Sequence, residues 1–227
     1  MCFSTEASFA AGAVLTVIGI ATIKTAQSPA HRFFASIPFL FALQQISEGF
    51  LWLSFSNPLY APLQQASTYV FLFFAEILWP IWVPLAVYKL EPLAKRKKFL
   101  KIFIGLGAFV SLYLTYCLIN YPVEAIAMNH HIHYKQSFPL SFSPYATIIY
   151  VIATVIPHFI SSIRRMWMFG STVFVSYLIT AIFYTNYIVS VWCFFASIIS
   201  ISIFAILYMH NKTTQVGDDL IKIRSDS

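Results

Sequence analysis

The segment Phe33–Phe55, FFASIPFLFALQQISEGFLWLSF, contains 23 residues, and Glu48 is its only charged side chain. A helix needs about 20 mostly apolar residues to cross a bilayer, so this segment is long enough. Other charge-poor runs follow the same pattern, and they predict an all-α integral membrane protein with about seven transmembrane helices. The expected helices are Ser8–Ile23, Phe33–Phe55, Ala66–Tyr88, Phe99–Asn120, Tyr145–Ile163, Trp167–Thr185 and Tyr187–Met209.

The composition supports this class, because 59% of the residues are hydrophobic and only 10% are charged. A soluble domain carries about 25% charged residues. We expect one transmembrane domain over residues 1–209, followed by a polar, disordered cytoplasmic tail over residues 210–227. Only Asn186 and neighbouring tyrosines separate the last two runs, so a count of six helices stays open.

The basic residues predict the orientation in the membrane. Thirteen of the 14 Lys and Arg residues fall on alternate junctions between the runs, and only Lys135 falls on the other side. Lys and Arg are enriched in cytoplasmic loops, so we expect the N-terminus outside and the C-terminus in the cytoplasm. Because the net charge of +6 arises from these short clusters, it indicates the lipid bilayer as partner and no nucleic acid.

The longest connection, Tyr121 to Pro144, joins the fourth and fifth expected helices on the outside. Val123–Met128 and His131–Lys135 flank the turn-prone Asn129, which predicts a β-hairpin over the bundle.

Three acidic or histidine side chains lie inside the expected helices, and such groups are costly in a membrane unless they are paired or hydrated. They are Glu48, Glu76 and His158. We expect an outward-open pocket with Glu48 and Glu76 in its floor, whereas in the alternative reading a neutral Glu48 only joins helices through hydrogen bonds. His158 fits a hydrogen-bonded interfacial role better. The candidate ligand-binding residues are Gln44, Gln45, Glu48, Trp52, Glu76, Trp79, His131, Tyr134, Trp192 and Cys193, with His130, His131 and His133 closing the pocket.

A metal site is a weaker hypothesis. His131 and His133 would share one face of a strand and could chelate a metal ion if Glu124 completed the set. Exposed loop histidines without a ligand are the alternative. Cys193 fits a small packing residue better than a nucleophile, because the sequence shows no partner base. Packing or interface anchoring likewise competes with ligand contact for Trp79 and Trp192.

At these residues the chain resembles an uncharacterised family of prokaryotic multi-pass membrane proteins over nearly its whole length. The resemblance implies a multi-pass protein of a prokaryotic inner membrane and no particular reaction. It rests on Met1-Cys2-Phe3-Ser4, the Gln-Gln-x-x-Glu-Gly stretch Gln44 to Gly49, Trp79-Pro80, the histidine loop His130 to Tyr134, and Ser190 to Phe195.

Better-known families with seven helices fit less well. A retinal protein needs a lysine within its last helix, but Lys212 follows the last run, so a retinal Schiff base is not expected. Zinc hydrolases of the ceramidase and adiponectin-receptor type need several histidines and an aspartate within the helices, whereas the expected helices here contain only His158 and no aspartate. A G-protein-coupled receptor would end its third helix with an Asp-Arg-Tyr-like triplet, where Tyr88-Lys89-Leu90 stands here.

Three functions follow from these residues. The leading hypothesis is a noncatalytic site for a small molecule, lipid headgroup or ion, used in sensing or transport. The second is a membrane-embedded enzyme, either metal-assisted through the loop histidines or acid/base through Glu48 and Glu76. The third is a structural membrane subunit whose polar residues only join helices.

Overall fold

The computed structural model describes residues 4–128, 130–139 and 143–208. The expected tail 210–227, the turn residue Asn129 and the first three residues of the Met-Cys-Phe-Ser motif lie outside this part of the chain. The described part is mostly helical, with one two-stranded sheet.

The first half of the chain forms α1 (Thr5–Thr25), α2 (Pro29–Ala35) and α3 (Ile37–Ser56), followed by the 3₁₀ turn η1 (Pro58–Tyr60). We expected a single helix over Phe33–Phe55, and the structure corrects this, because α2 ends at Ala35 and α3 begins at Ile37. Pro38 stands in the first turn of α3, where its missing N–H costs no helical hydrogen bond.

The third expected helix, Ala66–Tyr88, is an apolar helical segment over Leu63–Leu90. It consists of α4 (Leu63–Leu72), the π-helical stretch η2 (Phe73–Leu78) and α5 (Trp79–Leu90). A π stretch is rare and often marks a functional position in a helix. Glu76 lies in this stretch.

The second half contains α6 (Ala94–Asn120), the strands β1 (Val123–Met128) and β2 (His131–Gln136), then α7 (Ser143–Ile160) and α8 (Met166–Phe183). The 3₁₀ turn η3 (Thr185–Tyr187) connects α8 to α9 (Ile188–Ser200), and the helical segment continues to Tyr208. The last two expected helices are therefore separate, and the β-hairpin expected between the fourth and fifth helices is confirmed.

Five helical segments in the described chain are long and apolar enough to cross a membrane: Thr5–Thr25, Leu63–Leu90, Ala94–Asn120, Met166–Phe183 and Thr185–Tyr208. Helix α3 has 20 residues, but Gln44, Gln45 and Glu48 lower its hydropathy. The apolar part of α7, Pro144–Ile160, is shorter.

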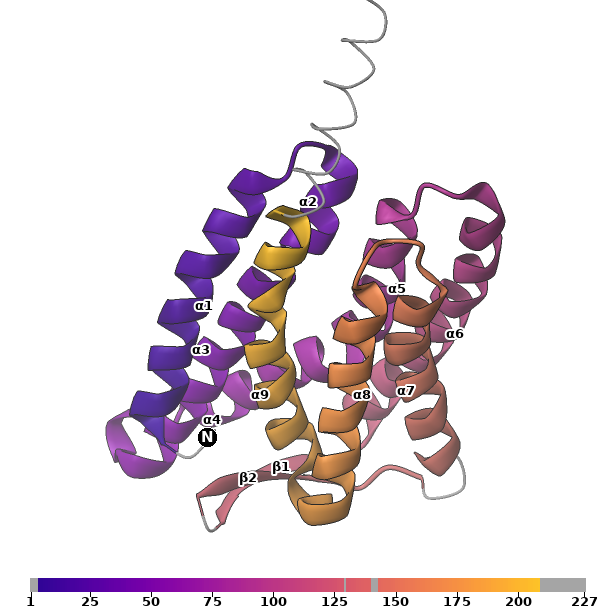
Figure 1. Cartoon of the computed structure of the whole chain (residues 1–227). Helices are drawn as coiled ribbons and strands as arrows, with labels where there is room; N and C mark the ends of the chain where they lie inside the picture. Colours follow the sequence, from indigo (N-terminus) through magenta and orange to yellow (C-terminus); the bar gives the residue numbers. More distant parts are fainter. Residues whose placement is uncertain (1–3, 129, 140–142, 209–227) are drawn as a thin grey trace, which may run out of the picture.

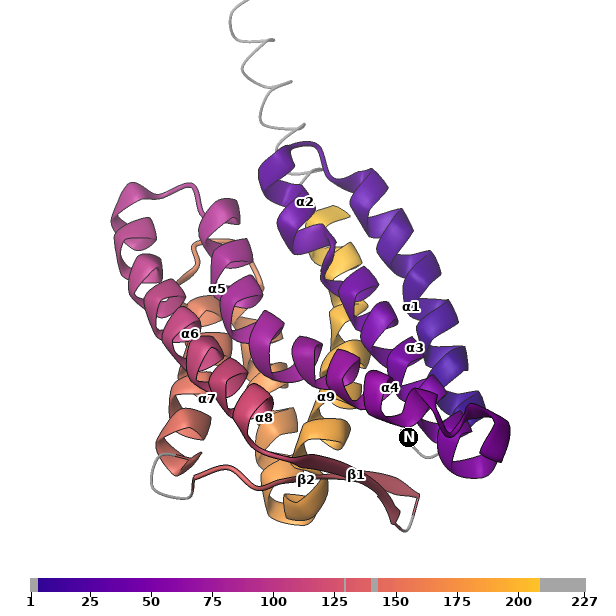
Figure 2. The same ribbon diagram turned by 180° about the vertical axis from the view of Figure 1, so that it is seen from behind.

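The helices form an upright bundle with two different ends (Figure 1). At one end lie the connections α1–α2, α5–α6 and α7–α8, which carry most of the Lys and Arg residues, and we call this the basic end. The hairpin crosses the opposite end, beside the starts of α4 and α9, as the view from behind also shows (Figure 2). We call this the hairpin end.

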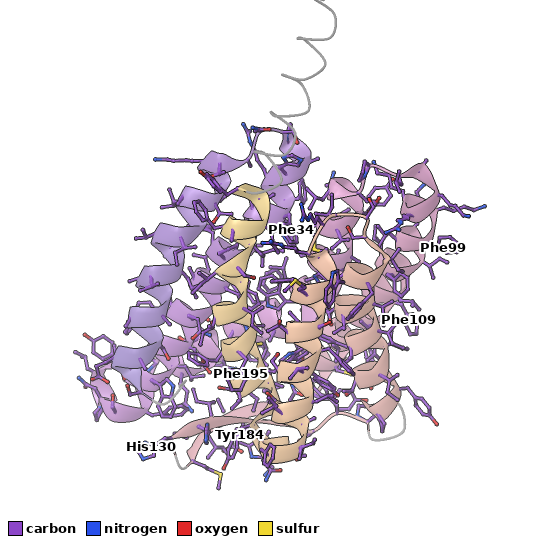
Figure 3. The ribbon with its side chains drawn as sticks, viewed as in Figure 1. Phe34, Phe99, Phe109, His130, Tyr184 and Phe195 are labelled. Atoms are coloured by element: carbon purple, nitrogen blue, oxygen red, sulfur yellow. The ribbon has the colours of Figure 1, made fainter. Side chains whose placement is uncertain are left out.

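The surface of the bundle is apolar around its sides. Phe99 and Phe109 project outward from α6 and are each about half exposed, whereas Phe34 is fully buried (Figure 3). Large apolar side chains that face outward are expected where lipid, and not water, surrounds a protein. The chain is therefore built as a membrane protein.

One face of the hairpin packs on the bundle. Ala125, Ile132 and Tyr134 belong to this face and are buried together with residues of α3 and α4. The Tyr134 ring stacks on Phe71 of α4 with centroids 4.9 Å apart. The hairpin is thus fixed over the bundle by this face.

Candidate functional site

The π stretch owes its irregular backbone to the proline that follows it. Pro80 has no N–H to donate, so carbonyl groups one turn earlier need other partners. The Tyr150 hydroxyl of α7 donates to the Ala75 carbonyl at 2.5 Å, and the Ser111 hydroxyl of α6 donates to the Ile77 carbonyl at 2.8 Å. Two neighbouring helices therefore hold the backbone on both sides of Glu76.

Glu76 is 94% buried, because only 6% of its surface is exposed. The Gln136 side chain, at the end of β2, donates a hydrogen bond to Oε1 of Glu76. Its second oxygen, Oε2, has no hydrogen-bond partner among the described residues. A buried carboxyl oxygen without a donor is costly, and such an atom marks a place where a ligand or water can bind.

Glu76 lines a cavity of about 270 Å³. The walls come from α6, from the end of the hairpin, and from the hairpin-end turns of α7 and α9, so the cavity lies in the hairpin half of the bundle. Ligand pockets usually measure about 300 to 1,000 Å³, and this one would fit a small ligand. It is lined by Ala75, Glu76, Tyr113, Leu114, Gln136, Phe138, Ala146, Thr147, Tyr150, Val151, Tyr177, Ile188, Val189, Trp192 and Cys193.

Aromatic rings form one wall of this cavity. Trp192 lies edge-on to Tyr150, with centroids 5.6 Å apart, and to Tyr177, with centroids 5.0 Å apart. The indole N–H of Trp192 is buried and has no partner among the described residues. The wall thus offers ring faces together with an unused hydrogen-bond donor.

A second, smaller cavity of about 50 Å³ lies on the other side of this wall. It shares Tyr150, Trp192 and Cys193 with the larger cavity and extends along α7 to Thr154 and His158. His158 is buried, bonds the Val155 carbonyl through Nδ1 at 3.1 Å and packs on Phe169. His158 is thus hydrogen-bonded, as expected, and it lies in the protein interior in the last turn of α7.

Gln44, Glu48, Trp79 and Cys193 form a connected buried group beside the cavity. The Trp79 indole donates to Oε1 of Gln44 at 2.7 Å, and the Ser190 hydroxyl donates to Oε1 of Glu48 at 2.7 Å. Cys193 is buried and lies near Gln44, Glu48 and Glu76. The structure thus brings both carboxyl groups near Cys193, but Glu48 is not among the residues that line the cavity.

The other predicted site residues have different surroundings. Gln45 is fully buried, and neither of its amide atoms has a partner among the described residues. Trp52 packs edge-on against Phe55, and Tyr134 packs on the bundle as described above. These three residues do not line the cavity.

The predicted histidine face of the hairpin is present. Glu124, Ile126 and Met128 lie opposite Lys135, His133 and His131 in the antiparallel register, so His131, His133 and Glu124 share one face.

Aromatic rings surround both histidines. His131 stacks on Tyr187 with centroids 4.8 Å apart and also contacts Tyr184, which is labelled at the hairpin end in Figure 3. His133 lies 6.1 Å from the Tyr187 ring. Burial lowers the pKa of His131. No cluster of three His, Cys, Asp or Glu side chains suited to a metal occurs in the described ranges, and the metal role of this pair stays a prediction.

A fourth buried ionisable group, Glu91, follows α5 at the basic end and is fully buried. Its carboxyl accepts hydrogen bonds from the Leu93 N–H at 3.0 Å, the Ser162 N–H at 2.6 Å, the Ser162 hydroxyl at 2.5 Å and the Ser161 hydroxyl at 3.2 Å. Burial acts to raise the pKa of Glu91, but these hydrogen bonds hold it below its ordinary value.

Sequence reasoning missed Gln136, Tyr113, Tyr150 and Tyr177 as parts of the cavity. One signal was present, since Tyr150, Thr154 and His158 recur every four residues and so share one face of α7. No local pattern indicates that Gln136 meets Glu76, because 60 residues separate them.

The comparisons with known proteins indicate a family and no activity. No curated protein and no solved structure matches the chain significantly. Residues 1–217 match the model of DUF6629, a family of unknown function. Because this match covers nearly the whole sequence, the chain belongs to the DUF6629 family.

Proposed function

We propose that this protein crosses a prokaryotic cell membrane seven times and binds a small ligand in an outward-facing pocket, for sensing or transport. The seven crossings are the five long apolar segments together with α3 and α7. Helix α3 contacts α1, α4 and α9, so its polar residues face protein and need not meet lipid.

The distribution of charge supports the orientation in this proposal. The basic end carries Lys24, Arg32, Lys89 and the cluster Lys95–Lys101, and the hairpin end carries Lys135. Placing the basic end in the cytoplasm satisfies the positive-inside rule. The cavity beside Glu76 then lies in the outer half of the membrane.

The observation that carries the ligand site is Glu76: this buried residue lines the 270 Å³ cavity, and its Oε2 atom has no partner among the described residues. A residue that only joined helices would have its hydrogen bonds satisfied by other helices. The π stretch and the two hydroxyl groups from α6 and α7 hold this carboxyl in place, which is the kind of preorganisation that a binding site needs.

A labelling experiment tests the pocket and its orientation together. Val189 lines the cavity in the first turn of α9, so Val189→Cys should react with a small, membrane-impermeant thiol reagent added to intact cells. The background is the Cys2→Ser variant, because Cys2 precedes α1 on the side proposed to face outward and would react itself, whereas Cys117 and Cys193 are buried. Ala94→Cys, at the basic end, should react only after the cells are opened.

Two outcomes would contradict the proposal. Labelling of Ala94→Cys in intact cells would reverse the orientation. A folded Val189→Cys protein that reacts no faster than the Cys2→Ser background would show that the cavity is closed to the outside.

A further inference from the structure

We infer that the ligand of the Glu76 cavity is a small organic cation, of the alkylammonium class, held between the carboxyl group and the aromatic wall. This inference rests on the proposed function, and it names the chemistry of the ligand at that site. It starts from the charges that line the cavity.

Glu76 is the only ionisable acid or base of the Asp, Glu, Lys, Arg and His types among the described residues that line the cavity. A carboxylate in such surroundings needs an opposite charge, because the low dielectric disfavours an isolated ion. Gln136 supplies one neutral donor to Oε1, which leaves Oε2 free for a cationic partner. An anionic ligand would meet repulsion from the same group.

The rest of the wall favours an organic cation over a metal ion. Trp192 contacts both Tyr150 and Tyr177, and the three aromatic residues line the cavity. Ring faces attract alkylammonium groups through cation–π interaction, and cages of such rings bind quaternary ammonium ligands. A bare Ca²⁺ or Mg²⁺ ion needs about six or more oxygen ligands, and the wall is mostly carbon.

The size of the cavity is consistent with this class. At about 270 Å³ it lies just below the usual range of ligand pockets, so the bound group must be compact. A tetrahedral ammonium group with short substituents can contact the carboxyl and two rings at once.

The test is isothermal titration calorimetry of the purified full chain with three probes: tetramethylammonium, choline and 3,3-dimethylbutan-1-ol. The alcohol has the shape of choline without the charge. We expect saturable binding of tetramethylammonium and choline, and binding of the alcohol weaker by about tenfold or more.

The variants assign the binding to this cavity. Glu76→Gln keeps the shape and removes the charge, so it should weaken choline binding by about tenfold or more. Trp192→Leu should weaken it severalfold, whereas Trp192→Phe keeps a ring face and should bind nearly as wild type does. Glu6→Gln is the matched control, because Glu6 is exposed in the first turn of α1 and should not affect binding.

The outcomes separate this inference from the pocket proposal. If choline and the neutral alcohol bind equally well, and Glu76→Gln does not change this, the inference of a cationic ligand is wrong while the proposal of a pocket stands. If no probe gives heat of binding although Val189→Cys is labelled from outside, the inference of a cationic ligand is also wrong. Failure of the Val189 labelling would overturn the pocket, and the cation site with it.

Discussion

Glu76 lies within the apolar segment Leu63–Leu90 and Glu91 directly follows it; both carboxyl groups are buried, but their surroundings differ. Glu91, at the basic end, accepts four hydrogen bonds from Leu93, Ser161 and Ser162. Glu76, toward the hairpin end, has one donor and an oxygen without a partner on a cavity wall. Burial alone therefore does not indicate function. A buried polar atom without a hydrogen-bond partner indicates a ligand site better.

The two carboxyl groups should respond differently to mutation. Removing a satisfied buried group leaves its donors unpaired and destabilises the fold. Removing a group that is only partly satisfied costs less stability and affects ligand binding more. The predictions below test this contrast, from the largest expected change in stability to the smallest.

Substitutions that disturb the backbone around Glu76 should destabilise the protein most. A Cβ atom at Gly107 would lie 1.8 Å from the Pro80 carbonyl oxygen, whereas nothing lies within 4 Å of one at Gly105. Gly107→Ala should therefore push α5 and α6 apart and cost about 3 kcal/mol or more of unfolding free energy. Gly105→Ala is the control and should leave the thermal unfolding temperature in detergent unchanged. Equal effects of both changes would show that α5 and α6 do not pack closely here.

Glu91→Gln should also destabilise the protein, by about 2 kcal/mol. The amide keeps one acceptor oxygen, but its NH₂ group would face donors from Ser161 and Ser162. Thermal unfolding at neutral pH measures the loss, with Glu124→Gln on the exposed face of the hairpin as control. A stable Glu91→Gln protein would show that these hydrogen bonds add little, and it would remove the contrast with Glu76.

The stability of the protein should also depend on pH through the Glu91 carboxyl group. Because the pKa of Glu91 is lower in the folded protein than its ordinary value of 4.5, the ionised form is favoured by folding. Its contribution is fully present above about pH 4.5 and is lost as the pH falls through the folded pKa. The difference in unfolding temperature between wild type and Glu91→Gln should therefore narrow on acidification from pH 6 to pH 3. A constant difference over this range would contradict the role of the Glu91 charge.

The difference between the two carboxyl groups also explains what could be predicted from the sequence. Glu76 stands inside a long apolar run, where an acidic residue is conspicuous, so the sequence was enough to select it. Glu91 stands among polar residues at a junction, and its burial depends on the α7–α8 connection, 70 residues away in the chain. The helical runs and the hairpin were predictable because their signals are local. The break at Ser36 and the π stretch each precede a proline, Pro38 and Pro80, which signals an irregular backbone but does not fix its form.

Only part of the predicted site lies together in the structure, because local sequence signals reveal some contacts and not others. Polar residues one turn apart on α3 were recognisable as one face, and Gln44 and Glu48 do meet α5 and α9. Trp192 of the aromatic wall was predicted, but Tyr150 of α7 and Tyr177 of α8 look like ordinary lipid-facing residues in the sequence. Only the packing of these helices shows which rings face the cavity.

Glu76→Gln should change stability by less than about 1 kcal/mol. Gln136 can still donate to the amide oxygen, and the carboxyl oxygen that becomes the NH₂ group had no protein donor. Thermal unfolding without added ligand measures this, with Glu91→Gln compared in the same detergent. A loss as large as that of Glu91→Gln would show that Glu76 is mainly structural and would count against the ligand site.

Glu48→Gln should have the smallest effect, within about 0.5 kcal/mol. Glu48 is fully buried and accepts from Ser190, and Gln is nearly isosteric and keeps an acceptor for that hydroxyl. We therefore expect unchanged unfolding and unchanged choline binding, so that Glu48 joins α3 to α9 while Glu76 contacts the ligand. Glu48→Leu is the comparison, because it removes the acceptor and should destabilise the protein by about 1 to 3 kcal/mol. If Glu48→Gln folds normally but no longer binds choline, the charge of Glu48 belongs to the site. A Glu48→Gln/Glu76→Gln double variant that binds choline no more weakly than either single variant would then show that the two carboxyl groups act together.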